Sequence, residues 1–457
     1  MPAKMEHPTR LTLIATCLAF VVVLLDTSIV NVAINTMRTN FHADISGIQW
    51  IINAYSVSFS ALLLTAGILG DRFGCKPVFL TGFALFTFGS LCCALSSTLV
   101  ALIASRIIQG AGAALLVPAS LSVIRTLFAE DVLRARAIGW WGASGGIALA
   151  AGPVIGGLLV SHLGWSSIFL LNIPLGIFGF IVVRRYAPET FPDKGRSMDI
   201  PGQLTGILML SSLTYGLIES SHYGWTSLVV LISFSCAVIF GVIFILIEFH
   251  HPQPMLPLQL FRNPVLSVTT VTGLVANLAF YGMIFVLSLY FQSVRHLSPE
   301  KTGLAFLPMM AVLMLFNIIS GRLIPRIGAG RLIVAGLLIS ASGYALLLLV
   351  THSSSPWNMA AAMLLAGSGI ALSIPAITNV TLSSVSAKNT GMVSGLLNAA
   401  RQVGGVIGVA LFGTLINGQT DKQFMHGMHA SLMISSGLLM GSAWLIFKKL
   451  RHSTSPA

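Results

Sequence analysis

Long apolar runs dominate this chain of 457 residues and constrain its fold more than any other feature. A run of about 18 or more apolar residues can cross the hydrocarbon core of a bilayer as a helix. Only 8% of the residues are charged, against about 25% in ordinary soluble domains, and the mean hydropathy is +0.89. The runs are continuous and lack the alternation of barrel strands. The sequence therefore predicts an all-α integral membrane protein rather than a soluble domain.

Fourteen such runs can be placed, which predicts fourteen transmembrane helices. The first run follows Lys4 and Arg10 and is longer than the apolar core of a cleaved signal peptide, so we expect it to be a span. The runs cover approximately residues 11–33, 48–69, 78–96, 99–120, 137–160, 165–186, 202–221, 227–249, 267–291, 303–321, 331–350, 357–380, 391–417 and 430–447.

The positions of the basic residues predict the orientation. An even number of spans places both termini on one side of the membrane, and Lys and Arg concentrate in cytoplasmic loops. The side opposite the termini holds only Arg38, Arg295, Lys301 and Lys422, whereas nearly all other Lys and Arg lie on the terminal side. We therefore expect both termini to be cytoplasmic. The net charge of +12 is explained by orientation, and we expect no nucleic-acid partner.

Two loops rich in proline and charge, residues 187–200 and 250–266, are typical of linkers. They are expected to separate an N-terminal six-helix bundle (1–186), a central transmembrane hairpin of two helices (201–249), and a C-terminal six-helix bundle with a short basic tail (267–457).

The motif G-x-L-x-x-R-x-G occurs once in each six-helix region. Each copy follows a long apolar run and opens a short basic loop. The copies consist of Gly67, Leu69, Arg72 and Gly74, and of Gly321, Leu323, Arg326 and Gly328. Chains built from two such repeats place a substrate at the interface of the halves and move one half against the other. The layout therefore predicts a transporter.

Three ionisable side chains lie deep in the predicted spans: Asp26, Arg106 and Arg401. Burial of such a group is costly, so each one is a functional hypothesis. At ~1.5 Å per residue, Asp26 and Arg106 both lie roughly 10 Å below the outer surface, which permits a direct or water-bridged ion pair. The pair is either structural, or Asp26 exchanges a proton during transport under the influence of Arg106. Arg401 either completes a charge network or only donates to helix carbonyls.

The remaining polar residues suggest little other chemistry. Glu219 in the central hairpin is either a second protonation site or a solvated span end, and Glu248 is expected at the membrane interface. The histidines are scattered, and the five cysteines have no metal-ligand spacing. We expect no metal, no cofactor and no enzymatic activity, which disfavours a membrane enzyme acting on lipid-linked substrates.

Small residues and a proline in the fifth span, Gly152, Pro153, Gly156 and Gly157, predict a close and bendable helix contact. Such a contact suits a gate, although tight packing without motion would use the same residues. Candidates for a substrate cavity, which could equally be packing residues, are Asn53, Tyr55, Gln109, Asn277, Phe280, Tyr281 and Phe285. Aromatic residues with few acids suit a lipophilic or cationic organic substrate.

Four segments together resemble the major facilitator superfamily, and specifically its fourteen-span drug:proton antiporter branch. They are Leu25–Ala33 in the first span, Gly67–Lys76 in the loop after the second, Arg106–Gly112 in the fourth, and Gly152–Gly157 in the fifth. The resemblance covers nearly the whole chain, with Cys75 departing from the basic residue usual at its position.

The resemblance implies the major facilitator fold and export coupled to proton entry. Asp26 would carry the proton, and Arg106 would govern its exchange. Gly67, Asp71, Arg72, Gly74 and Lys76 would form a cytoplasmic latch that breaks when access switches. The second copy of the motif has Pro325 in place of the acid, so the latch is expected on one side only.

These observations predict a multidrug exporter of the bacterial inner membrane, monomeric in the lipid bilayer, with protons and a small molecule as its partners. The expected substrates are lipophilic and cationic, exported by alternating access. The alternative is export of an anionic or neutral metabolite by the same fold, because Arg106 and Arg401 could hold an anion.

Overall fold

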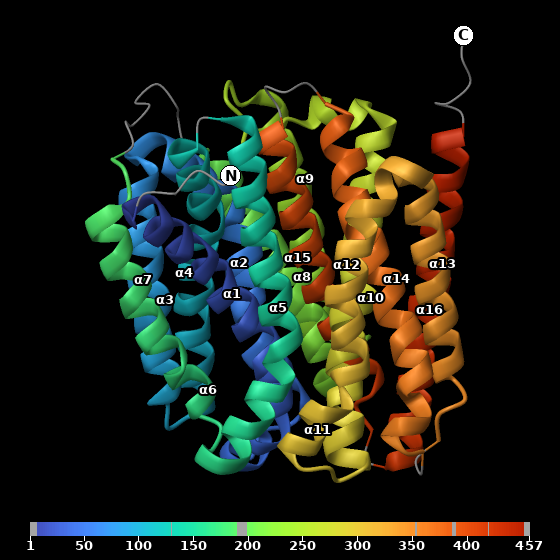
Figure 1. Ribbon diagram of the computed structural model, residues 1–457. Coiled ribbons are helices and arrows are strands. Elements are labelled where there is room, and N and C mark those ends of the chain that lie inside the picture. Colours follow the sequence, from blue (N-terminus) through green and yellow to red (C-terminus); the bar gives the residue numbers. More distant parts are fainter. Residues whose placement is uncertain are drawn as a thin grey trace.

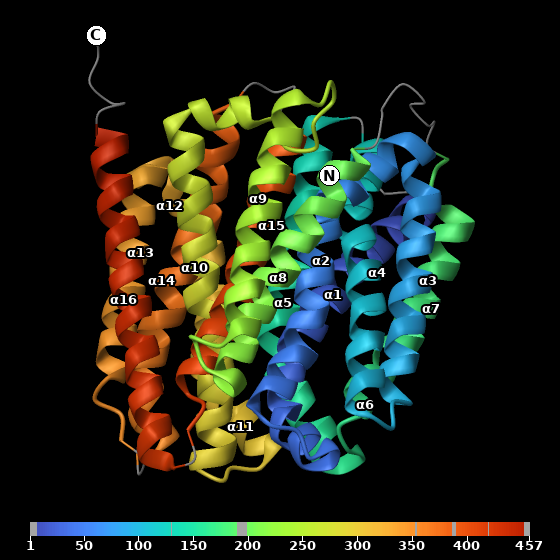
Figure 2. The same ribbon diagram turned by 180° about the vertical axis from the view of Figure 1, so that it is seen from behind.

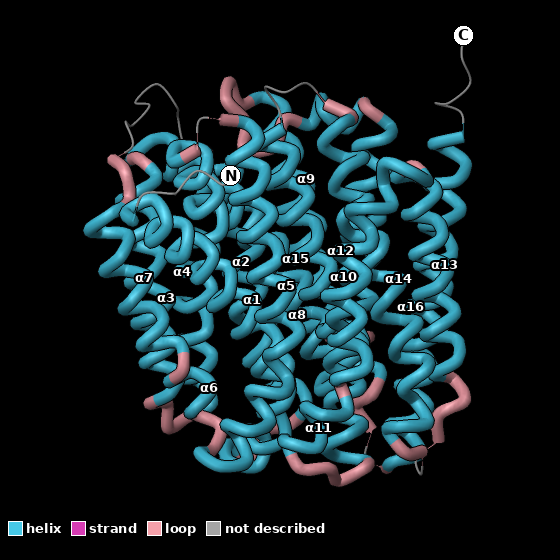
Figure 3. The backbone as a smooth tube through the Cα atoms, in the orientation of Figure 1, coloured by secondary structure: helices cyan, strands magenta, loops and turns pink. Residues whose placement is uncertain are grey.

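The computed structural model describes residues 7–128, 130–189, 199–351, 354–385, 390–418 and 420–451. Over these ranges the chain is helical and contains no strand (Figure 3). The long helices run side by side as one bundle, and α1 begins at the same end of the bundle at which α16 finishes (Figure 1). This agrees with an even number of crossings.

Fourteen helices of at least 15 residues occur among the described residues. They are α1 (His7–Phe41), α2 (Ile45–Phe73), α3 (Cys75–Ala94), α4 (Leu99–Leu127), α5 (Asp131–Leu163), α7 (Asn172–Tyr186), α8 (Ile200–Tyr223), α9 (Leu228–His250), α10 (Pro264–Leu289), α12 (Leu307–Ile327), α13 (Ala329–Leu347), α14 (Pro356–Ser383), α15 (Thr390–Leu415) and α16 (Asp421–Arg451). Shorter elements are α6 (Ser167–Leu170), η1 (Leu258–Arg262), η2 (Tyr290–Val294) and α11 (Pro299–Ala305).

Thirteen segments of the described chain are long and apolar enough to cross a membrane. They match thirteen of the predicted spans and show a multi-pass membrane protein. The predicted span 202–221 coincides with α8, which has sufficient length but is not among those thirteen segments. Gln203 and Glu219 contribute to its lower hydropathy, so the number fourteen remains a prediction.

Helix ends follow local chemistry rather than the edges of the apolar runs. Thr98 caps α4 by accepting a hydrogen bond from the backbone N–H of Ala101 at 3.2 Å, which separates α3 from α4 where the turn was predicted. The predicted span 165–186 is divided into α6 and α7 at Leu171, and α11 and α12 are divided at Phe306. Most of the predicted linker 187–200, namely residues 190–198, lies outside the described residues.

The two copies of the repeated motif have the same backbone geometry. Gly74 follows α2 with φ of 92° and ψ of 141°, and Gly328 follows α12 with φ of 89° and ψ of 138°. A residue with a side chain is strained at such φ values, so glycine is required at both turns. The sequence repeat therefore corresponds to a structural repeat.

Helices from the two six-helix regions are hydrogen bonded at the end of the bundle away from the termini. The amide of Gln292, in η2 after α10, donates to the backbone carbonyl of Asn31 on α1 at 3.1 Å, and the hydroxyl of Ser288 donates to the same carbonyl. On the other side, the Gln49 amide of α2 donates to the Ala410 carbonyl of α15 at 2.7 Å. Figure 2 shows α8 and α9 in front of this junction.

Candidate functional site

A buried carboxylate on α1 is the centre of a polar cluster. Asp26 is fully buried, and its Oδ2 lies 2.5 Å from Nη1 of Arg106 on α4. Its Oδ1 accepts from the amides of Gln109, at 2.8 Å, and Asn172, at 3.2 Å. Residues from two other helices, α4 and α7, therefore hold the carboxylate, and the structure brings Asp26 and Arg106 into direct contact.

Arg106 is enclosed as completely as its partner, with 1% of its surface exposed. Its Nε donates to the Ile51 carbonyl of α2 at 3.1 Å, and its Nη1 also donates to Oε1 of Gln109 at 2.6 Å. The guanidinium lies 4.3 Å from the ring centre of Tyr55 and 5.7 Å from that of Phe169. A buried ion pair is tolerated only when such additional partners satisfy its donors and acceptors.

This arrangement suits proton exchange better than metal binding. The carboxylate has a single charged partner, so a proton arriving on Asp26 would discharge the ion pair and leave Arg106 with its neutral partners. No group of three or more His, Cys, Asp or Glu side chains that could hold a metal ion occurs among the described residues.

Arg401 on α15 belongs to a different environment. Its Nη2 donates to the Ile374 carbonyl of α14 at 3.1 Å and to the Thr378 hydroxyl at 2.7 Å. Its Nε is buried and has no hydrogen-bond partner among the described residues. Arg401 therefore donates to one helix carbonyl and one hydroxyl, and its Nε is an unused donor.

The predicted cavity residues of the first half divide into two groups. Tyr55 and Gln109 contact the Asp26–Arg106 pair, and the Tyr55 hydroxyl donates to the Val23 carbonyl at 3.3 Å. Asn53 is fully buried, and neither atom of its amide has a hydrogen-bond partner in the described part of the chain.

The predicted cavity residues on α10 also differ in environment. Phe280 and Phe285 are buried in the largest hydrophobic cluster, where they pack between the halves. Asn277 donates to the Gly273 carbonyl one turn earlier at 3.0 Å. Tyr281 retains partial accessibility, so it is the member of the set best placed to meet a ligand.

Gly152 and Gly156 of α5 face α1. A Cβ atom at Gly152 would collide with the side chain of Ser28, and one at Gly156 would lie 2.6 Å from the side chain of Ile29. The small residues therefore allow α5 to pack directly on the helix that carries Asp26.

The same segment of α5 also faces α11 in the other half. A Cβ atom at Gly157 would lie 2.6 Å from the Pro299 carbonyl oxygen. In the reverse direction, a Cβ atom at Gly303 of α11 would collide with the carbonyl oxygen of Pro153. The segment Gly152–Gly157 is thus one surface of a close contact between the halves.

The predicted latch lies where α2 ends and α3 begins. Asp71 and Arg72 occupy the last turn of α2, and the Arg72 guanidinium lies 5.6 Å from the ring centre of Phe73. Nζ of Lys76 lies 2.7 Å from a carboxylate oxygen of Glu189, a contact that the sequence did not indicate. The Glu189 side chain is 77% exposed, so this ion pair contributes little to stability.

Comparison with known proteins identifies the family. The family model described as Major Facilitator Superfamily matches residues 16–409. The chain belongs to the major facilitator superfamily. Members of this superfamily are transporters of small molecules, not enzymes.

Several curated relatives are named for drug resistance. The chain is 35% identical over 458 residues to a methylenomycin A resistance protein of Streptomyces coelicolor, covering 99% of this chain and 96% of the relative. It is 35% identical to the multidrug resistance protein Stp of Mycobacterium tuberculosis, covering 90% of this chain and 76% of the relative. These names support a drug exporter.

Solved structures agree on the fold. A bacterial homologue of the human lysosomal transporter Spinster superimposes with a TM-score of 0.67 at 17% identity. The match covers 99% of this chain and 100% of that one. The chain therefore has the major facilitator fold.

In this transporter, some members of the Asp26 cluster had no predicted role. Asn172 is a polar residue in an apolar run, which is a usable signal, but its partner could not be known from the sequence. The hydroxyl of Ser90 on α3 accepts from the Gln109 amide at 2.8 Å and orients it. Serine is common in membrane helices, so Ser90 carried no signal.

Glu219 on α8 is partly buried and has hydrogen-bond partners on α2. Its carboxylate accepts from the Ser46 hydroxyl at 3.2 Å and from the Trp50 indole at 2.9 Å, both on α2. On the other side of α8, the Thr414 hydroxyl of α15 donates to the Leu217 carbonyl at 2.7 Å. The outer end of α8 therefore bonds to both halves of the transporter.

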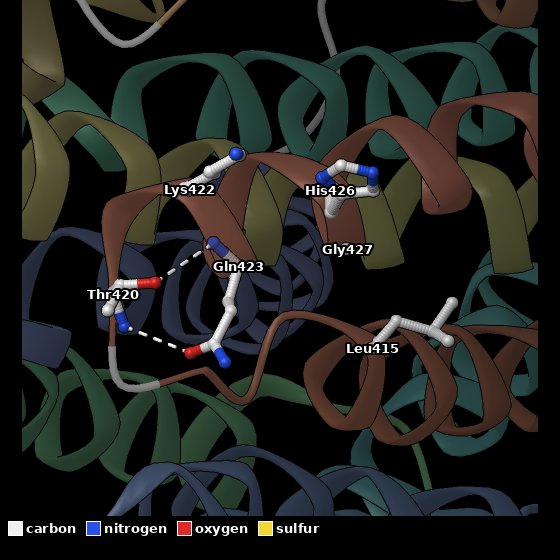
Figure 4. Close-up of a pocket in the computed structure, with 6 residues that line it drawn as sticks. All are labelled: Leu415, Thr420, Lys422, Gln423, His426 and Gly427. Atoms are coloured by element: carbon white, nitrogen blue, oxygen red, sulfur yellow. Dashed lines mark hydrogen bonds between the residues drawn. The ribbon is translucent and has the colours of Figure 1, made fainter.

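A cavity of about 440 Å³ lies away from the Asp26 cluster, at the outer ends of α15 and α16 (Figure 4). It is lined by Leu415, Thr420, Lys422, Gln423, His426 and Gly427. Thr420 and Gln423 bond to each other reciprocally across the start of α16. Thr420 and Gln423 thus cap the start of α16, and no residue of the Asp26 cluster is among those that line the cavity.

Proposed function

We propose that this protein exports lipophilic drugs or antibiotics from the bacterial cytoplasm in exchange for protons. It would act as a fourteen-span drug:proton antiporter of the inner membrane, with both termini in the cytoplasm. The observation that carries the proposal is the buried Asp26–Arg106 pair in a chain whose relatives are named for resistance.

Asp26 is the proposed proton carrier. Its carboxylate is buried against the Arg106 guanidinium, so a change in access to water would let it exchange a proton. Protonation removes the attraction to Arg106 and loosens the contact between α1 and α4. Each charge that crosses 100 mV supplies about 2.3 kcal/mol, which is sufficient to concentrate a substrate.

The other predicted motifs have roles in the same cycle. Gly152, Pro153, Gly156 and Gly157 form the outer gate between α5 and its neighbours. Gly67, Asp71, Arg72, Gly74 and Lys76 form the cytoplasmic latch. The central hairpin, residues 201–249, accompanies two six-helix bundles that alternate around the substrate, and the transporter works as a monomer.

Export by cells tests this function. Intracellular methylenomycin A, the compound named in a relative, is measured by mass spectrometry with and without a protonophore. Wild type should lower the intracellular concentration only while a proton gradient exists, and Asp26→Asn should abolish this effect while the protein remains in the membrane. Undiminished, pH-dependent export by Asp26→Asn would disprove proton transfer at this residue.

The drug-export proposal has its own negative outcome. If cells expressing wild type retain methylenomycin A and a panel of lipophilic antibiotics unchanged, the protein is not a drug exporter. Export of an anionic or neutral metabolite is then the better account, and competition by organic anions alone would support it. The uncompensated charge of Arg401 favours the anionic form of that alternative.

A further inference from the structure

We propose that Arg401 is the charge-recognising residue of the substrate site, and that the exported compounds are lipophilic acids bound as anions. This inference rests on the proposed export function and adds the chemical class of the substrate. It replaces the expectation of a cation, because the acid that lies deep in the first half, Asp26, is already paired with Arg106.

The donors of Arg401 are only partly used. An arginine side chain has five N–H donors. Nη2 donates to the Ile374 carbonyl and the Thr378 hydroxyl, whereas Nε is buried and has no partner in the described segments of the chain. Buried polar groups are normally hydrogen bonded, so this unused donor indicates a place for an acceptor.

The charge of Arg401 is also uncompensated. From residue 267 to the end of the chain the only acids are Glu300 and Asp421. Both lie in the first turn of a helix at the outer end of the bundle, α11 and α16. A positive charge left unpaired inside a membrane is costly, which favours a negatively charged ligand beside it.

Asp26 cannot supply the missing charge. Its carboxylate is already occupied by Arg106, and it lies five residues inward of Asn31, whose carbonyl bonds Ser288 on α10. Arg401 lies beside Gly273, fifteen residues inward of Ser288. At ~1.5 Å per residue, Asp26 and Arg401 differ in depth by about 15 Å. The proton on Asp26 and the ligand charge at Arg401 would therefore occupy separate sites.

The surroundings of Arg401 suit an aromatic or aliphatic acid. A Cβ atom built at Gly273 would lie 3.7 Å from Nε of Arg401, so the backbone of α10 packs close to this buried donor. Tyr281, two turns further along α10, keeps partial accessibility, as does Arg401 itself. The Tyr281 ring could contact the apolar part of such a ligand while the Arg401 guanidinium binds its carboxylate. A cation would meet repulsion there.

Three probes that share a pyrene ring on a short alkyl chain and differ in the charge of the head group test the proposal: pyrenebutyrate, its methyl ester and pyrenebutyl-trimethylammonium. Binding to the purified full-length protein is measured by fluorescence titration. Wild type should bind the carboxylate at least about tenfold more tightly than the ester or the ammonium, the size expected for a buried charge pair. Equal or tighter binding of the ammonium or the ester, or no binding of any probe, would overturn the proposal.

The variants assign the preference to one residue. Arg401→Gln should remove the preference for the carboxylate and leave the affinity for the ester unchanged, whereas Arg401→Lys should retain part of it. Arg331→Gln is the matched control, since it removes the same charge from an exposed position at the start of α13. A carboxylate preference that survives Arg401→Gln contradicts the assignment. If that variant does not fold, the order of the three probe affinities in wild type still shows whether the site prefers an anion, a neutral compound or a cation.

The anion site and the proton carrier can fail independently. Asp26→Asn should bind pyrenebutyrate as wild type does, because the two sites are separate. If Asp26→Asn still couples transport to the proton gradient, the proton role is lost and the anion site remains. If Arg401→Gln keeps the carboxylate preference, the anion site is lost and the export function remains.

Discussion

At the scale of the residue, the Asp26–Arg106 pair combines deep burial with additional hydrogen-bond partners. Each side chain is almost completely buried, and each has further neutral hydrogen-bond partners. Such a pair is weak evidence for stability as such, because desolvation offsets the attraction. It is stronger evidence for function, because the gain or loss of one proton at Asp26 changes the balance between the desolvation cost of the two charges and their attraction.

The variant Arg106→Ala should destabilise the protein by about 3–5 kcal/mol, because it leaves the Asp26 carboxylate buried without its cation. Adding Asp26→Asn to it should recover a large part of that loss. Thermal unfolding of the detergent-solubilised proteins measures both effects. Equal stability of Arg106→Ala and the double variant would show that the two side chains do not act as a pair.

At the scale of the element, we expect the contact of α5 with α1 and α11 to determine whether the outer end is closed. The glycines at positions 152, 156 and 157 bring α5 against both neighbours, and Gly303 of α11 approaches the Pro153 carbonyl. Backbone atoms are in contact here, so the contact cannot absorb a side chain by a change of rotamer. It must open as a unit.

The variant Gly303→Val should therefore open the outer end. Overpacking of this kind costs about 1–3 kcal/mol. It would destabilise the closed state and leave the open state, in which α5 and α11 are apart, unaffected. A cysteine introduced at Ser288, buried and bonded to α1, should then react several-fold faster with a membrane-impermeant thiol reagent applied from outside. Gly437→Val, at a glycine of α16 with open space around it, is the control. Equal reactivity in all three backgrounds would refute this function of α5 and α11.

Much at this scale could be predicted from the sequence. The length of each apolar run located the helices, and the rise per residue of a helix placed Asp26 and Arg106 at the same depth. Both predictions need information from only one helix at a time. The neighbours of the pair could not be predicted, since Asn172 reaches Asp26 only through the break at Leu171 and the rotation of α7. The isolation of Arg401 was available as a signal, because only two acids follow residue 267.

At the scale of the whole molecule, two halves with the same loop geometry surround charges that are not symmetric. Gly74 and Gly328 adopt the same conformation, yet the acid-containing pair lies in the first half and the uncompensated arginine in the second. We interpret the first half as the proton side of the exchange and the second half as the substrate side. The membrane potential, negative inside, would assist both proton entry and the exit of an anion.

Proton movement driven by substrate tests the central claim most directly. Proteoliposomes loaded with methylenomycin A and a pH-sensitive dye are diluted into substrate-free buffer, with the membrane potential held at zero. Wild type should acidify the interior as the substrate leaves, and a protonophore or Asp26→Asn should abolish the signal. Simple diffusion of an acid in its neutral form would make the interior more alkaline, so the sign identifies exchange. Substrate efflux by wild type without acidification, or equal acidification by Asp26→Asn, would contradict proton-coupled export through Asp26.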